Sequence, residues 1–82
     1  MGSKKKIIFS RHAQERMELR KVSEEEVKDT ILHPTHKLPI NQEDNTQELR
    51  RKVGDKENYV VIELRKNELI VITTGWTQCL RK

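Results

Sequence analysis

The feature that most constrains the fold is a change in the spacing of apolar residues at Pro34. Before this proline, apolar side chains recur three or four residues apart, which is the period of an α-helix. From Lys37 onward they alternate with polar side chains, and a period of two is typical of β-strands. The chain is therefore expected to fold as an α+β domain, with helices first and a sheet after them.

Two helices are expected before Pro34. Ser10 is placed to cap a helix over Arg11–Lys21, a stretch that contains neither Gly nor Pro. Ser23 and Glu26 have the spacing of a capping box, which indicates the start of a second helix. Because a residue that precedes a proline disfavours the helical conformation, the second helix is expected to end just before Pro34.

The sheet is expected to consist of meandering strands. Residues 59–64 and 69–74 form the strongest strand pair, since both are rich in β-branched residues, and a turn centred on Lys66-Asn67 joins them. Weaker strand candidates at 38–40 and 49–53 precede this pair. The pattern predicts two N-terminal helices packed on a three- to four-stranded antiparallel sheet, with the helices covering one face.

A length of 82 residues fits a single domain. Residues 1–6, which include three lysines, are expected to form a basic, disordered arm, and residues 7–82 a single α+β domain. The run Lys6–Phe9, where the arm meets that domain, is either a short strand or a hydrophobic lead-in. The net charge of +4 is a moderate basic excess, which suits RNA as a partner.

Several kinds of site are not expected. Cys79 is the only cysteine, so neither an internal disulfide nor a cysteine-based zinc site can form. His33 and His36 flank Pro34 without further ligands nearby, and no metal site or cofactor is expected there. Nothing in the sequence resembles a signal peptide or a membrane span, and a cytoplasmic location is expected.

His12 and Arg16 are the first candidates for chemistry. Their four-residue spacing places one above the other on a helix. His12 falls in the first turn, where free backbone N–H groups and the helix dipole attract a phosphate, and a neutral imidazole can accept a proton. Arg16 can hold a phosphate through its planar fork. The alternative is an ordinary surface histidine and an arginine that is paired with Glu15 or Glu18.

The strands supply a second group of candidates. Side chains alternate along a strand, so Arg50 and Arg51 must face opposite sides, and Arg51 is expected beside Tyr59 and Glu63 on the sheet face away from the helices. An open face lined with Arg and Tyr is a plausible surface for RNA. Charge protection of an edge strand is the other interpretation of the arginines. Tyr59 and Trp76 either stack on RNA bases or serve in packing, with Trp76 covering the core.

The sequence also resembles a known family. Ser10–Val27 looks like the opening of a bacterial and archaeal domain family of unknown function, with the pattern His-Ala-x-x-Arg-Met, then Arg, an apolar residue, Ser and an acidic run. Ile31–Pro34 resembles that family's helix end, and 60–62 and 71–74 resemble its paired strands. The family is similar to the RelE and BrnT toxins and to the barnase–EndoU–colicin D–RelE ribonuclease group.

This resemblance implies RNA cleavage without a metal, often blocked by an antitoxin partner. The catalytic positions that carry over from the family are His12, Arg16, Arg51 (or Arg50) and Thr74. The chain departs from the family pattern at its last strand, where Gly75 intervenes before the aromatic Trp76.

Three functions remain open from the sequence. The first is an endoribonuclease, in which His12 takes the proton of a 2′-OH while Arg16 and Arg50 or Arg51 stabilise the charge on the phosphate. The second is a non-catalytic RNA-binding module that uses the same basic face. The third is a protein-interaction domain of a toxin–antitoxin-like pair, which would bind through an exposed edge strand or helix face.

Overall fold

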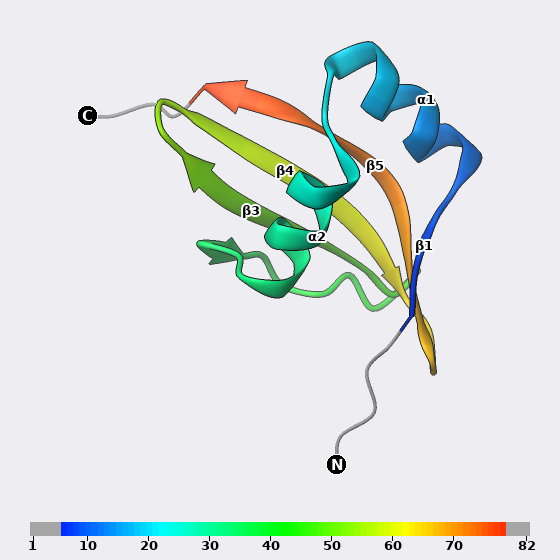
Figure 1. The fold of residues 1–82 in the computed structure, drawn as a ribbon. Helices are drawn as coiled ribbons and strands as arrows, with labels where there is room; N and C mark the ends of the chain where they lie inside the picture. The colour runs from blue at the N-terminus through cyan, green and yellow to red at the C-terminus, as the bar shows by residue number, and fades with distance from the viewer. Residues whose placement is uncertain (1–5, 79–82) are drawn as a thin grey trace.

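The computed structural model describes residues 6–78; residues 1–5 of the expected arm, and residues 79–82 with Cys79, lie outside the described residues. The elements follow in the order β1 (Lys6–Phe9), α1 (Arg11–Arg20), α2 (Glu24–Leu32), β2 (His36–Lys37), β3 (Thr46–Val53), β4 (Lys56–Leu64) and β5 (Glu68–Gln78). The described residues form an α+β fold of two helices and a five-stranded mixed sheet (Figure 1). Both helices precede Pro34, as the change of period predicts.

Both helices begin where the sequence predicts. The hydroxyl of Ser10 accepts a hydrogen bond from the backbone N–H of Ala13 at 3.1 Å. The hydroxyl of Ser23 accepts from the N–H of Glu26 at 3.1 Å, and the Glu26 carboxylate accepts from the N–H of Ser23 at 2.9 Å. This reciprocal pair is the predicted capping box. The first helix ends one residue earlier than expected, because Lys21 adopts a left-handed φ of 58°.

The strand order is β1-β5-β4-β3-β2, and neighbouring strands are antiparallel except for β1, which runs parallel to β5. The prediction of a three- to four-stranded antiparallel sheet is therefore wrong on strand number and on the direction of one strand. A strand of four residues is too short for a period to distinguish it from a lead-in. Lys6, which was assigned to the arm, is the first residue of β1 and lies opposite Glu68.

The sheet has a helical face and an open face. The helical face carries the core, in which both helices pack on the strands; its buried apolar residues are Ala13, Met17, Val22, Val27, Leu49, Val60, Ile62 and Val71. On β4, Val60 and Ile62 belong to this core, and Leu64 packs against it. The open face carries the residues that alternate with these, including Arg50 and Tyr59, and both helices lie on the opposite side of the sheet (Figure 1).

The edge strand differs in detail from the prediction. The edge strand lies at His36–Lys37 rather than at 38–40, and Pro39, which has no N–H to donate, stays outside the ladder. Of the residues in the turns next to β3 and β4, Asn45 and Gly54 adopt the left-handed conformation. Within residues 6–78, neither helix has the length and apolar character needed to cross a membrane.

Candidate functional site

The site begins on α1, where His12, Arg16 and Arg20 follow one another at four-residue spacing. We call these three residues the α1 stripe. Residues at this spacing lie one above the other on a helix. The neighbouring side of the helix is buried against the core through Ala13 and Met17. The stripe therefore lies beside the packed side of α1, partly open to solvent.

The predicted pair of His12 and Arg16 is brought together. Nε of Arg16 donates a hydrogen bond to Nε2 of His12 at 3.2 Å. The Nε of arginine always carries a hydrogen, so this contact requires Nε2 to act as the acceptor. Among the ion pairs of residues 6–78, Arg16 is not joined to Glu15 or Glu18, so the alternative from the sequence is not what the structure contains.

Arg20 is a site residue that the sequence reasoning missed. Its Nη1 donates to the Oη of Tyr59 at 2.8 Å and to the backbone O of Thr74 at 3.2 Å. Tyr59 lies on the open face, whereas α1 lies on the helical side. The Arg20 side chain therefore passes around the edge of β5, beyond Glu68–Val71 where the strand pairs with β1. The signal that would have found Arg20 is the continuation of the four-residue spacing from His12.

Gly75 makes this crossing possible. It lies opposite Tyr59 in the β4–β5 register and is buried. A Cβ at this position would lie 2.6 Å from Oη of Tyr59, 2.9 Å from its Cζ and 3.0 Å from Cδ of Arg20. Only a glycine leaves room for both side chains against the strand. The glycine that precedes Trp76 thus has a structural reason.

Thr74 lies beside this group but is fully buried. Its hydroxyl donates to the backbone O of Tyr59 at 2.7 Å and accepts from Nδ2 of Asn58 at 3.3 Å. Asn58 also donates to the O of Gly75 at 2.9 Å, and its Oδ1 lies 2.6 Å from the hydroxyl of Thr30. The Thr74 hydroxyl is therefore part of a buried network that joins β4, β5 and α2, and it is not exposed to solvent.

Of the two strand arginines, Arg50 and not Arg51 lies on the open face. In the β3–β4 register Arg50 is opposite Tyr59, and Arg51 is opposite the buried Asn58. Nη1 of Arg51 donates to the backbone O of His33 at the end of α2, at 3.0 Å. The expectation that Arg51 accompanies Tyr59 is therefore wrong. Hairpin register decides which side chains share a face, and a shift of one residue exchanges them.

The charge of Arg50 is balanced by two carboxylates. Its Nε lies 2.8 Å from Glu48 and its Nη1 lies 3.5 Å from Glu57. The hydrogen bond to Glu48, together with the attraction of both carboxylates, outweighs partial burial and raises the pKa of Arg50 above its ordinary value. Glu63, on the same face, pairs with Arg65 at 3.0 Å. The open face is thus nearly balanced in charge at its centre, and it lacks the basic excess that the sequence led us to expect.

Trp76 lies on the helical face and packs against the core. Its Nε1 is 3.5 Å from the backbone O of Lys21, and Nζ of Lys56 lies 4.7 Å from the centre of its ring. That cation–π contact occupies part of the ring surface. Of the two interpretations from the sequence, this placement fits core covering better than base stacking.

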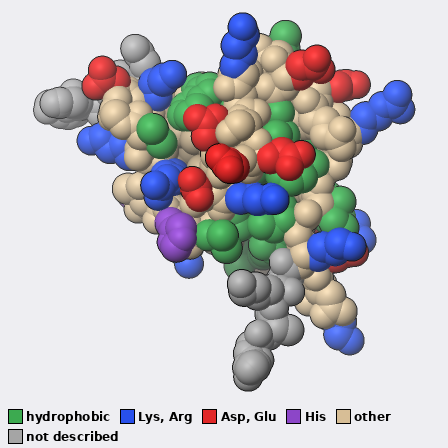
Figure 2. All heavy atoms as spheres, viewed as in Figure 1, with side chains coloured by type: hydrophobic (Ala, Val, Ile, Leu, Met, Phe, Trp, Pro, Cys, Tyr) green, Lys and Arg blue, Asp and Glu red, His purple; other side chains and the backbone are tan. Residues whose placement is uncertain are grey.

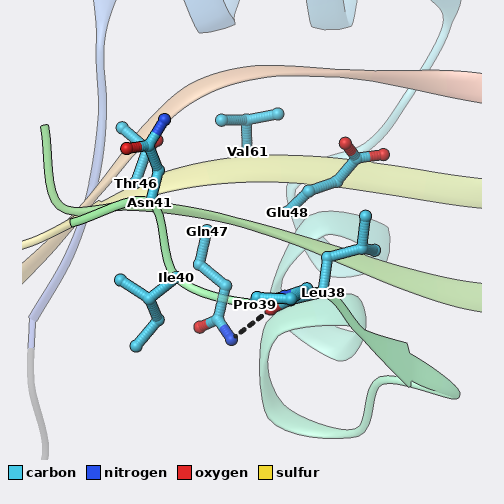
Figure 3. Close-up of a pocket in the computed structure, with 8 residues that line it drawn as sticks. All are labelled: Leu38, Pro39, Ile40, Asn41, Thr46, Gln47, Glu48 and Val61. Carbon is cyan, nitrogen blue, oxygen red and sulfur yellow. Dashed lines mark hydrogen bonds between the residues drawn. The ribbon is translucent and has the colours of Figure 1, made fainter. Parts of the chain in front are cut away.

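The rest of the described surface offers less to an anion. An open pocket of about 390 Å³ lies between Leu38–Ile40 and the strands β3 and β4 (Figure 3). Glu48 is its one ionisable lining residue, so the pocket carries no positive charge of its own. Acidic and basic side chains are interspersed on the side of the molecule drawn in Figure 2. Within residues 6–78, no cluster of three or more His, Cys, Asp or Glu side chains could hold a metal ion.

Comparison with known proteins identifies a family for this chain, but that family has no known activity. Residues 9–76 match the family model described as "Domain of unknown function (DUF4258)". No curated protein and no solved structure matches the chain. The matched span contains the whole α1 stripe, Tyr59 and Gly75.

Proposed function

The chain belongs to the DUF4258 family, and from the geometry of its site we propose that it is an endoribonuclease that binds single-stranded RNA along the α1 stripe and cleaves it without a metal. One observation carries the proposal. His12, Arg16 and Arg20 form a continuous line, and among residues 6–78 neither guanidinium has a carboxylate partner. Unpaired guanidinium groups with a planar fork are well suited to bind phosphates.

The resemblance to RelE- and BrnT-like ribonucleases supports the same proposal. It rests mainly on residues 10–27, which contain all three members of the α1 stripe. RNA is then the substrate, and an antitoxin-like protein is the partner expected to block the site.

The chemistry follows from the His12–Arg16 hydrogen bond. In the free protein the lone pair of Nε2 accepts from Arg16. When Arg16 turns to bind a phosphate, Nε2 becomes free to accept the proton of the neighbouring 2′-OH. The 2′-oxygen then attacks phosphorus, and the bond from phosphorus to the 5′-oxygen breaks. A cyclic 2′,3′-phosphate forms, and the leaving 5′-oxygen takes a proton from water. Arg16 stabilises the charge that grows on the phosphate oxygens.

A non-catalytic RNA-binding module is the second candidate, and a specific observation favours it. Arg51 lies on the helical face and the Thr74 hydroxyl is buried. Two of the four catalytic positions implied by the family resemblance therefore do not join His12 and Arg16. Phosphate binding along the α1 stripe requires neither of them.

RNA cleavage in EDTA, with and without ribosomes, tests the proposal. His12→Ala should reduce the cleavage rate by roughly 100-fold or more, the usual effect of losing a general base. Arg16→Lys should also impair cleavage, because lysine keeps the charge but loses the fork. His36→Ala is the matched control, since His36 is an exposed histidine on β2 and should leave the rate unchanged.

Each variant is first shown to be folded by circular dichroism and urea unfolding. A folded His12→Ala protein that cleaves at the wild-type rate would refute the mechanism. If the wild type binds RNA in every condition but cleaves none, the second candidate is correct. A rate that falls in EDTA would show that a metal takes part.

A further inference from the structure

The Tyr59 ring is fixed on the open face by contacts from two other elements. Its Oη accepts a hydrogen bond from Nη1 of Arg20 at 2.8 Å, and the phenol end of the ring lies directly over Gly75. Tyr59 itself remains partly exposed. A fixed, partly exposed aromatic ring loses little conformational freedom when a flat ligand stacks on it.

Arg20 uses only part of its hydrogen-bonding capacity. Nη1 makes both of its hydrogen bonds, while Nε and Nη2 donate to no other side chain or backbone group of residues 6–78. No carboxylate in that part of the chain forms an ion pair with Arg20. The remaining N–H groups are held beside the Tyr59 ring and are free to bind a phosphate.

We propose that Arg20, Tyr59 and Gly75 form a nucleotide subsite, in which an RNA base stacks on the Tyr59 ring and the phosphate of that nucleotide binds Arg20. The inference rests on the proposed function, because it places the nucleotide next to the one whose phosphate Arg16 holds. Arg16 and Arg20 are about 6 Å apart along the helix axis, from a rise of about 1.5 Å per residue. One nucleotide of an extended strand bridges such a separation.

The charges around Tyr59 determine the path of the backbone of the bound RNA. On the side away from Arg20, Tyr59 faces Arg50, which Glu48 and Glu57 already neutralise. Those carboxylates repel a phosphate on that side. The RNA backbone therefore follows α1, and the base points toward the sheet.

Binding of an uncleavable probe tests the subsite separately from catalysis. The probe is a short fluorescent single-stranded RNA with 2′-O-methyl riboses, which has no 2′-OH to attack, and a series of such probes carries one abasic position each. With the wild-type protein, removal of the base at one position should weaken binding about tenfold, the order expected for a lost stacking contact. Tyr59→Leu should remove this sensitivity, whereas Tyr59→Phe, which keeps the ring, should retain it.

A charge variant tests the phosphate contact. Arg20→Gln should lower affinity and reduce the slope of log affinity against log salt by about one. Arg65→Gln is the matched control, because Arg65 is paired with Glu63 and lies outside the subsite. Its affinity and salt slope should remain close to those of the wild type.

The outcomes separate the subsite from the reaction. If no abasic position weakens binding to the wild type, or if the sensitivity survives Tyr59→Leu, the subsite is refuted. Binding that depends on Tyr59 and Arg20 without any cleavage of natural RNA supports the subsite and refutes the reaction. Cleavage that is unaffected by both substitutions supports the reaction and refutes the subsite.

Discussion

Single residues around β5 link the two faces of the sheet. Because Gly75 has no side chain, Arg20 can pass around the edge of β5 next to it and reach the phenol of Tyr59. Thr74 and Asn58 are buried and hydrogen-bonded: Asn58 donates to the Thr74 hydroxyl, which donates to the backbone O of Tyr59. Because buried polar groups are costly when they are left unpaired, this network fixes the strand position that the Arg20 contact needs. The site geometry therefore depends on residues that do not themselves meet solvent.

Gly75→Ala should lower the free energy of unfolding by about 1–3 kcal/mol, the usual range for an overpacked site. The added Cβ would lie 2.6 Å from Oη of Tyr59, so the ring must move and its contact with Arg20 must weaken. Urea unfolding measures the change. Tyr59→Leu should relieve part of the loss when it is combined with Gly75→Ala, because the clashing atoms are then absent.

Gly54→Asn is the control for this substitution. Gly54 has a φ of +64° and no heavy atom within 4 Å of an added Cβ, and asparagine tolerates the left-handed region. The expected change is within about 0.5 kcal/mol. If Gly75→Ala changes the free energy of unfolding as little as Gly54→Asn does, Tyr59 is not fixed against β5.

Among the elements, α1 and the β3–β4 hairpin differ in how their arginines are used. On α1, Arg16 contacts His12, and Arg20 contacts Tyr59 and a backbone carbonyl, with no carboxylate partner in residues 6–78. On β3, Arg50 lies between two carboxylates. An arginine that is paired with carboxylates must break those ion pairs before it can bind an RNA phosphate. An arginine without a carboxylate partner does not. The proposed phosphate binding is therefore expected on the helix rather than on the sheet.

Arg16→Gln should weaken RNA binding, because one phosphate contact is lost. The slope of log affinity against log salt concentration should decrease in magnitude by about one. Arg50→Gln removes the same charge and should have a smaller effect on both quantities. Fluorescence anisotropy across a salt series measures them. Equal effects of the two substitutions would mean that attraction to RNA is diffuse and that the α1 stripe is not a site.

At the scale of the whole molecule, β1 joins the start of the described chain to its last strand. Residues 6–9 pair with residues 68–71 in parallel. Along the chain, both helices come after β1 and before the other four strands. A parallel neighbour requires such a crossover, which places α1 over β5. The pairing therefore positions the α1 stripe next to the β5 edge.

Ile7→Ala should destabilise the protein by about 2 kcal/mol, the lower end of the range for buried isoleucine, since Ile7 packs against the core but is only partly buried. Ile8→Ala should cost less than about 1 kcal/mol, because Ile8 alternates to the other side of the strand and is not part of that packing. Urea unfolding of each variant is followed by circular dichroism and by Trp76 fluorescence. For each variant the two signals should report the same single transition. Two separate transitions, or equal losses at the two positions, would contradict the described role of β1.

The sequence by itself determined the local features of the fold and one half of the site. The helix caps at Ser10 and Ser23, the helix end before Pro34 and the two long strands depend on hydrogen bonds and periods within a few residues. The His12–Arg16 contact could be predicted for the same reason, because a four-residue spacing on a helix suffices to bring two side chains together.

Only the tertiary structure decided the other half of the site. Arg20 and Tyr59 are 39 residues apart, and their contact requires β5 to lie between them with a glycine at the crossing. The exchange of Arg50 for Arg51 on the open face depends on hairpin register, which no single strand encodes. The parallel partner of β1 lies at the far end of the chain. Periodicity describes one segment at a time, whereas register and side-chain reach are properties of segments that have already packed together.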